Sequence, residues 1–148
     1  MNTRTYWGAL LLGVAAMAAV DEIVFHQILA WHHFYDGSTT AVALLSDGLL
    51  HAGKLFAFVA GFFLMLDARR RETFRADAAW AGFLVGAGAF QLFDGLINHK
   101  VLGLHQVRYD VELLPYDLAW NAAGLALLAA GILLTVRARR GSRCSRTP

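Results

Sequence analysis

The chain has 148 residues, of which 57% are hydrophobic and 16% are charged, and its mean hydropathy is +0.48. Soluble domains average roughly 45–50% apolar and about 25% charged residues, so a soluble single domain is the poorer interpretation. The net charge is +2, and the 13 Lys and Arg residues lie in clumps rather than in a basic stripe, which argues against nucleic-acid binding. The single cysteine excludes a disulfide framework or a thiolate metal cluster within one chain.

Four apolar stretches are long enough to cross a hydrocarbon core, which takes ~20 helical residues. They are Tyr6–Ala30, Ala41–Leu66, Ala78–Asn98 and Tyr116–Val136. Arginines precede the first stretch, separate the second from the third, and follow the fourth as a basic tail over 137–148. The positive-inside rule therefore places both termini and the middle loop in the cytoplasm. We expect an all-α integral membrane protein of the bacterial inner membrane, a single domain over 1–148 folded as a four-transmembrane-helix bundle.

The first apolar stretch also has the format of a cleaved signal peptide, because Arg4 and an apolar run precede Ala16-Met17-Ala18. The apolar pattern resumes after Glu22, however, and the segment takes part in an internal repeat. We therefore interpret it as a membrane span.

The repeat is the pattern Asp-x4-His-x5-His, which occurs at Asp21, His26 and His32 and again at Asp94, His99 and His105. The helices that follow also correspond, with Asp47 and His51 matching Asp117 and Asn121. Two repeated helical hairpins, over about 6–66 and 78–136, are predicted. Because both start in the cytoplasm, their pseudo-twofold axis should run along the membrane normal, with the first and third helices across the bundle from each other.

Depth in the membrane groups the polar residues into tiers in the outer half of the bundle. At 1.5 Å per residue, one tier lies roughly 22 to 24 Å from the cytoplasmic ends; its members are Asp21, His51, Asp94 and Asn121. One to two turns further out is a second tier, formed by His26, His99, Asp47 and Asp117. A third, more exposed level at the outer interface contains His32, His33 and His105. Ionisable groups at such depth generally face the bundle interior and have partners.

Carboxylates and imidazoles that converge inside a bundle favour a divalent transition metal, with zinc, copper and iron all suited to the donors. The predicted ligands are His26, His51, His99, Asp21, Asp47, Asp94 and Asp117. Auxiliary residues are Glu22, His32, His33, Lys54, His105 and Asn121. Copper(I) is disfavoured because the three methionines lie far from the histidines.

Helical spacing supports part of this ligand set. Asp47 and His51 are four residues apart and share a helix face. Asp21 and His26 are five apart, as are their counterparts in the second repeat, which separates them by about 140° on an α-helix. Both can point inward only if a π-bulge intervenes or if they serve different tiers. Glu22 has a glycine, Gly95, as its counterpart, which makes the two halves chemically unequal.

Three alternatives to a metal-binding protein remain open at this stage. A membrane metalloenzyme or redox protein would use an open coordination position, with Glu22 or a free aspartate as base. A haem held between His26 and His99 is disfavoured because four aspartates lie at neighbouring depths. In a purely structural network, Lys54 would neutralise Asp47, seven residues before it.

The expected partners are the lipid bilayer, a metal ion, and a second copy or another membrane protein. The residues do not decide whether there is turnover.

Three segments of the sequence resemble a known family: Asp21–His33, Asp47–His51 and Gly95–Arg108. The chain is similar, from roughly Gly13 to Leu133, to the bacterial predicted membrane proteins catalogued as domain of unknown function 2243. The resemblance implies an integral membrane protein with four helices and no assigned activity. The sequence departs from the family pattern at Glu22, where glycine is usual, and at Gln106, where a second histidine is common.

Overall fold

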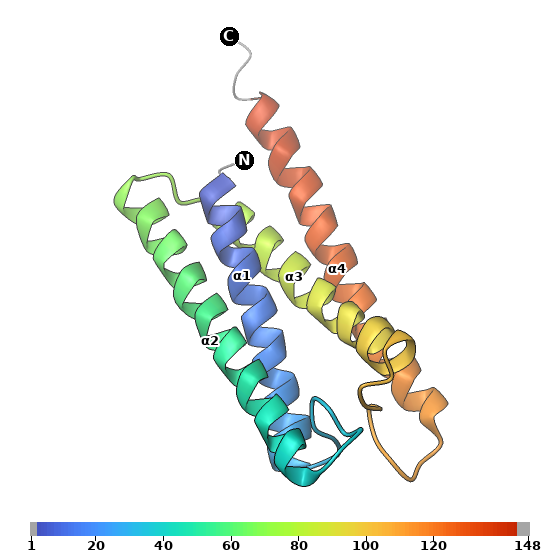
Figure 1. Ribbon diagram of the computed structural model, residues 1–148. Helices are drawn as coiled ribbons and strands as arrows, with labels where there is room; N and C mark the ends of the chain where they lie inside the picture. The colour runs from blue at the N-terminus through green and yellow to red at the C-terminus, as the bar shows by residue number, and fades with distance from the viewer. Residues whose placement is uncertain (1–2, 145–148) are drawn as a thin grey trace.

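The structure, a computed structural model, describes residues 3–144, and within that range it is helical, without strands. Its helical segments, in chain order, are α1 (Thr3–Val20), η1 (Asp21–Ile28), α2 (Thr40–Arg70), α3 (Ala76–Phe93), η2 (Asp94–Val101) and α4 (Leu113–Cys144) (Figure 1). The segments η1 and η2 are π-helices that continue α1 and α3 without a break. Residues 145–148 of the predicted basic tail lie outside the described range.

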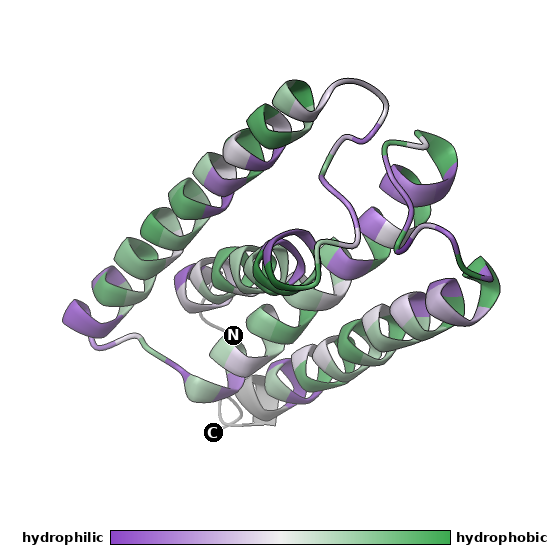
Figure 2. Ribbon diagram, turned by 90° about the horizontal axis from the view of Figure 1, so that it is seen from below, coloured by the Kyte–Doolittle hydropathy of each residue, from purple (hydrophilic) through white to green (hydrophobic). Residues whose placement is uncertain are grey.

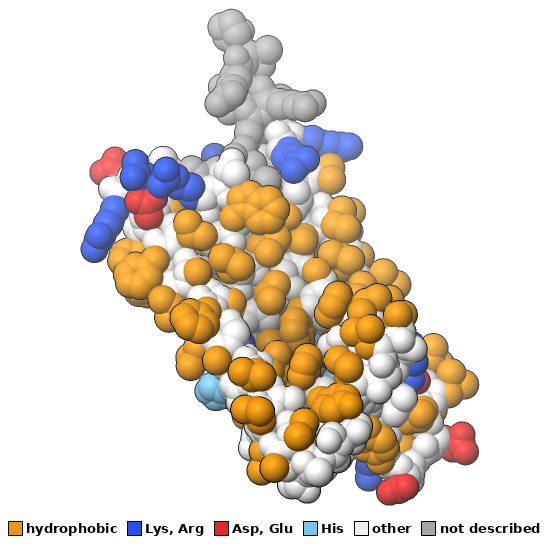
Figure 3. Space-filling model, viewed as in Figure 1, with side chains coloured by type: hydrophobic (Ala, Val, Ile, Leu, Met, Phe, Trp, Pro, Cys, Tyr) orange, Lys and Arg blue, Asp and Glu red, His pale blue; other side chains and the backbone are white. Residues whose placement is uncertain are grey.

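Within residues 3–144, four helices are long and apolar enough to cross a membrane, as the sequence predicts. They are Thr3–Ile28, Thr40–Arg70, Ala76–Val101 and Leu113–Arg140. Leucine and phenylalanine side chains are exposed along them and cover the middle of the molecule (Figure 3). Such an apolar surface is suited to lipid and unsuited to water. The predicted all-α membrane fold is therefore confirmed.

The helices are arranged around a central pair. α1 packs against α3, α2 packs against α1, and α4 packs against α3 (Figures 1 and 2). Within the described residues α2 and α4 do not contact each other, so the four helices do not close into a ring. The expectation that the first and third helices lie across the bundle is wrong, because these two make direct contact. The pseudo-twofold axis stays a prediction.

Glycines explain why α1 and α3 can approach so closely. A Cβ atom added at Gly86 would lie 2.1 Å from the carbonyl oxygen of Leu10, and one at Gly13 would lie 2.0 Å from that of Phe83. Without side chains at these positions the two backbones meet directly, the packing mode that small residues allow in membranes. A side chain at either position would push the helices apart.

We expect Gly86→Ala to destabilise the fold by about 1–3 kcal/mol, because the methyl group overlaps the backbone of α1. The control is Gly53→Ala in α2, where an added Cβ meets no atom within 4 Å. Both changes raise helix propensity equally, so their difference isolates packing. Unfolding in sodium dodecyl sulfate, followed by circular dichroism, measures it. Equal stability of the two variants would contradict the close α1–α3 contact.

Candidate metal centre

Six buried side chains of the metal-ligating type gather in two groups. They belong to the ends of the α1–η1 and α3–η2 helices, and to the connections after them, which lie away from the described chain ends (Figure 1). The first group consists of Asp21, His26 and His32, and the second group consists of Asp94, His99 and His105. In each group, one ligand atom per residue lies within 4.8 Å of the others. Each of the six residues is at most 3% exposed.

The π-helices bring the first two members of each group together. In η1 the N–H of Leu29 donates to the carbonyl of Val24 at 2.8 Å, the five-residue hydrogen bond that defines a π turn. This wider turn places residues five apart on one face. Asp21 and His26 are consequently both buried, with His26 Nε2 3.5 Å from an Asp21 oxygen. Of the two possibilities that the sequence spacing left open, the structure has the π turn.

The third member of each group comes from the connection that follows. Two residues after each π-helix the backbone takes a left-handed conformation, at Ala30 with φ 48° and at Gly103 with φ 60°. The chain thereby turns back, and His32 and His105 return to Asp21 and Asp94, the first residues of the π-helices. The expectation that these two histidines are exposed at the outer interface is wrong: both are buried.

In the first group both imidazoles are fixed through Nδ1 and present Nε2 to the carboxylate. His26 Nδ1 lies 2.9 Å from an Asp47 oxygen, and His32 Nδ1 lies 2.8 Å from the carbonyl oxygen of Val107. The Nε2 atoms lie 3.5 and 3.7 Å from the two Asp21 oxygens. Both Nε2 atoms and Asp21 Oδ1 are buried without a hydrogen-bond partner among the described residues. These are the atoms and the supporting contacts that a metal-binding imidazole requires.

The second group has a similar arrangement, but its side chains make closer contacts with one another. His105 Nδ1 lies 2.9 Å from the carbonyl oxygen of Phe34, and its Nε2 lies 3.0 Å from His99 Nε2. His99 Nε2 is also 2.9 Å from an Asp94 oxygen. The Asn98 side-chain amide donates to the other oxygen of Asp94 at 2.8 Å.

The two groups touch. The rings of His32 and His105 stack with centroids 4.6 Å apart and an interplanar angle of 10°. Each of these rings bonds to a carbonyl of the opposite connection, Val107 for His32 and Phe34 for His105. Burial lowers the pKa of His105 to about 4, so this ring is neutral at physiological pH and has a lone pair to offer.

Two aspartates predicted as ligands lie outside the groups. Asp47 accepts from both His26 and His33, at 2.9 and 2.7 Å, and so holds the His26 ring from the side away from Asp21. Its counterpart Asp117 lies 2.6 Å from the ammonium of Lys100. The two halves therefore use corresponding carboxylates differently.

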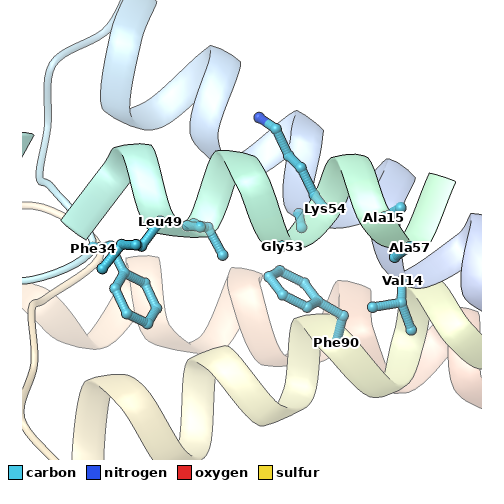
Figure 4. Close-up of a pocket in the computed structure, with 10 residues that line it drawn as sticks. Val14, Ala15, Phe34, Leu49, Gly53, Lys54, Ala57 and Phe90 are labelled. Carbon is cyan, nitrogen blue, oxygen red and sulfur yellow. The ribbon is translucent and has the colours of Figure 1, made fainter. Parts of the chain in front are cut away.

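Glu22, His51 and Lys54 form a separate cluster between η1 and α2. Glu22 Oε1 lies 2.8 Å from His51 Nδ1, and its other oxygen pairs with the Lys54 ammonium. His51, predicted as a ligand, has a 53% exposed side chain and belongs to neither group. Lys54 neutralises Glu22, which corrects the expectation that it would neutralise Asp47. Its stem lines an apolar cavity of about 360 Å³, and its amine points away from the apolar side chains (Figure 4).

The second half has no such cluster. The side-chain amide of Asn121 donates to the carbonyl of Asp117 at 2.9 Å. A Cβ atom at Gly95 would lie 2.6 Å from Asn121 Oδ1, so this half has no room for a counterpart of Glu22. The predicted difference between Glu22 and its counterpart Gly95 is thus a difference in packing as well as in charge.

Comparison with known proteins identifies a family but no individual relative. Searches of the curated proteins and of the solved structures found no match. Residues 8–138 match the family described as predicted membrane protein, domain of unknown function 2243. This range contains all four apolar helices for most of their length and every member of both groups. The chain therefore belongs to this family of predicted membrane proteins.

Proposed function

We propose that this membrane protein binds divalent transition-metal ions, one in each of the two groups. The observation that carries the proposal is the first group, in which two buried Nε2 atoms and a carboxylate oxygen face one another without hydrogen-bond partners. Burying three such atoms unsatisfied is costly. A cation between them would satisfy all of them at once.

The donor set narrows the choice of ion. Two imidazoles and one carboxylate suit zinc(II), iron(II) and copper(II), while magnesium and calcium prefer oxygen alone. Three protein ligands leave at least one coordination position open. Storage, insertion into another protein or sensing all need an ion that can be reached and exchanged, and an open position serves each of them.

The open position also supports a second candidate function, a metalloenzyme or redox protein that uses the same ions. Haem is disfavoured by the structure. The imidazoles of His26 and His99 are linked through the rings of His32 and His105, with successive centroids 4.6 Å apart. A porphyrin between His26 and His99 would have to displace that packed pair.

The distribution of charge bears on orientation. Arginine side chains gather at the end that contains the described chain ends and the α2–α3 connection (Figure 3). The metal centre lies at the opposite end, where Lys100 and Arg108 are the cations. By the positive-inside rule we infer that the centre faces the periplasmic or extracellular side.

Elemental analysis tests the proposal directly. The protein is purified in detergent through a tag without histidine, since a nickel column would load the site. We expect about two zinc, iron or copper ions per chain, either as isolated or after incubation with each metal, because there are two groups. A visible spectrum of the same sample distinguishes the ions, and a Soret band would indicate haem. Protein that contains no metal and takes none up contradicts the proposal and leaves the structural network.

A further inference from the structure

We propose that the two groups are unequal: the first group binds its ion more tightly and fills first, and the second group holds the ion that exchanges. The inference rests on the proposed function. It comes from contacts that differ between the halves at positions that correspond in the sequence repeat: His26 with Asp47, His99 with His105, and Asp117 with Lys100.

The first difference lies in which ring nitrogens are already engaged. In the first group His26 and His32 are held through Nδ1, by Asp47 and by the carbonyl of Val107. Both Nε2 atoms and Asp21 Oδ1 are buried without a hydrogen-bond partner among the described residues. No hydrogen bond within the group has to break before an ion enters.

In the second group the corresponding nitrogens are engaged with each other. His105 is held through Nδ1 by the carbonyl of Phe34, and its Nε2 lies 3.0 Å from His99 Nε2, which also lies 2.9 Å from an Asp94 oxygen. These two nitrogens are the ones that would face the ion. The contact between them must break before three ligand atoms are available, which lowers the affinity.

The second difference is the carboxylate behind the ligand. In the first group Asp47 holds His26 through Nδ1. In the second half His99 Nδ1 and Asp117 Oδ1 are both buried without a hydrogen-bond partner among the described residues, and the other Asp117 oxygen pairs with Lys100. A carboxylate behind a metal-bound imidazole is typically worth 10–100-fold in affinity. In the described part of the chain, the second group lacks a carboxylate bonded to His99 Nδ1 and therefore lacks this contribution to affinity.

The stacked rings of His32 and His105 add a further penalty to the second ion. They hold the groups in contact, so the second ion enters next to a bound divalent cation in a medium of low dielectric. Repulsion between the ions weakens the second binding step in proportion to their proximity. All these effects act in the same direction.

Calorimetric titration of the metal-free protein with Zn²⁺ tests the inference. We expect two binding steps whose affinities differ by at least ~10-fold. Asp47→Asn should weaken the tighter step by ~10–100-fold, whereas the matched variant Asp117→Asn should leave both steps nearly unchanged. Lys100→Met should free Asp117 for His99 and tighten the weaker step. The Lys100→Met variant tests the inference even if the Asp47→Asn variant folds poorly.

Two equal steps, or Asp117→Asn weakening binding as much as Asp47→Asn, would overturn the inference while leaving the proposed function intact. The absence of any Zn²⁺ binding would overturn both. Circular dichroism of each variant confirms that the helices are retained, so that a lost step reports on the site.

Discussion

His32→Ala should weaken metal binding at the first group by more than ~100-fold, reducing the content of the purified protein to about one ion per chain. The loss exceeds the 10–100-fold typical of residues behind a ligand, because His32 supplies a ligand atom itself. Its Nε2 lies 3.7 Å from Asp21 Oδ1, and both atoms are buried without a hydrogen-bond partner among the described residues. Elemental analysis after dialysis measures the content.

The matched control is His51→Ala, which removes an imidazole from the same half of the protein. His51 is exposed and bonded to Glu22, so we expect this variant to retain both ions. Loss of metal from His51→Ala with retention in His32→Ala would reverse the assignment of ligands. Equal loss from both variants would indicate a general effect on folding, which circular dichroism of the two samples detects independently.

The four spans were predictable because length and hydropathy are local properties of the sequence. The predicted stretch Ala78–Asn98 and the observed Ala76–Val101 differ by only a few residues at each end. The order of the helices in space was not predictable in the same way. It depends on where backbones can approach, and Gly13 and Gly86 are simply two among fourteen glycines until the interface is seen.

Part of the site followed from spacing. The five-residue interval between Asp21 and His26 required either a π turn or two separate levels, and η1 provides the π turn. The prediction for His32 is wrong because a helix that continued in a straight line would carry this residue outward. The left-handed residue Ala30 reverses the chain instead. A signal was present: His32 completes the motif that repeats at His105, so all three repeated positions carry the site.

His51 shows what depth alone leaves open. Its depth matches that of Asp21, but His51 bonds to Glu22, the residue that follows Asp21. Asp47 lies on the same face of α2, one turn nearer the preceding connection, and reaches His26. Contacts between helices, which a single sequence does not encode locally, decide which of the two residues touches the site.

The buried Glu22–Lys54 pair leads to a second large effect, on stability. Both side chains are 5% exposed, and the stem of Lys54 lines an apolar cavity, so neither charge is solvated if the other is removed. Lys54→Met should therefore destabilise the protein by about 3–5 kcal/mol, because it leaves Glu22 buried without its cation. The double variant Glu22→Gln/Lys54→Met should recover most of this loss, since it removes both charges.

Unfolding in sodium dodecyl sulfate measures all members of this double-mutant cycle, including Glu22→Gln alone. The control is Arg71→Gln, which breaks an exposed pair with Asp67 and should cost far less than Lys54→Met. A double variant as unstable as Lys54→Met would show that the stem of Lys54 acts through packing and not through its charge.

Metal content should not change in the double variant, because neither residue belongs to the first or the second group. Two neighbouring residues would then have separate roles: Asp21 would act in metal binding, and Glu22 would act in stability.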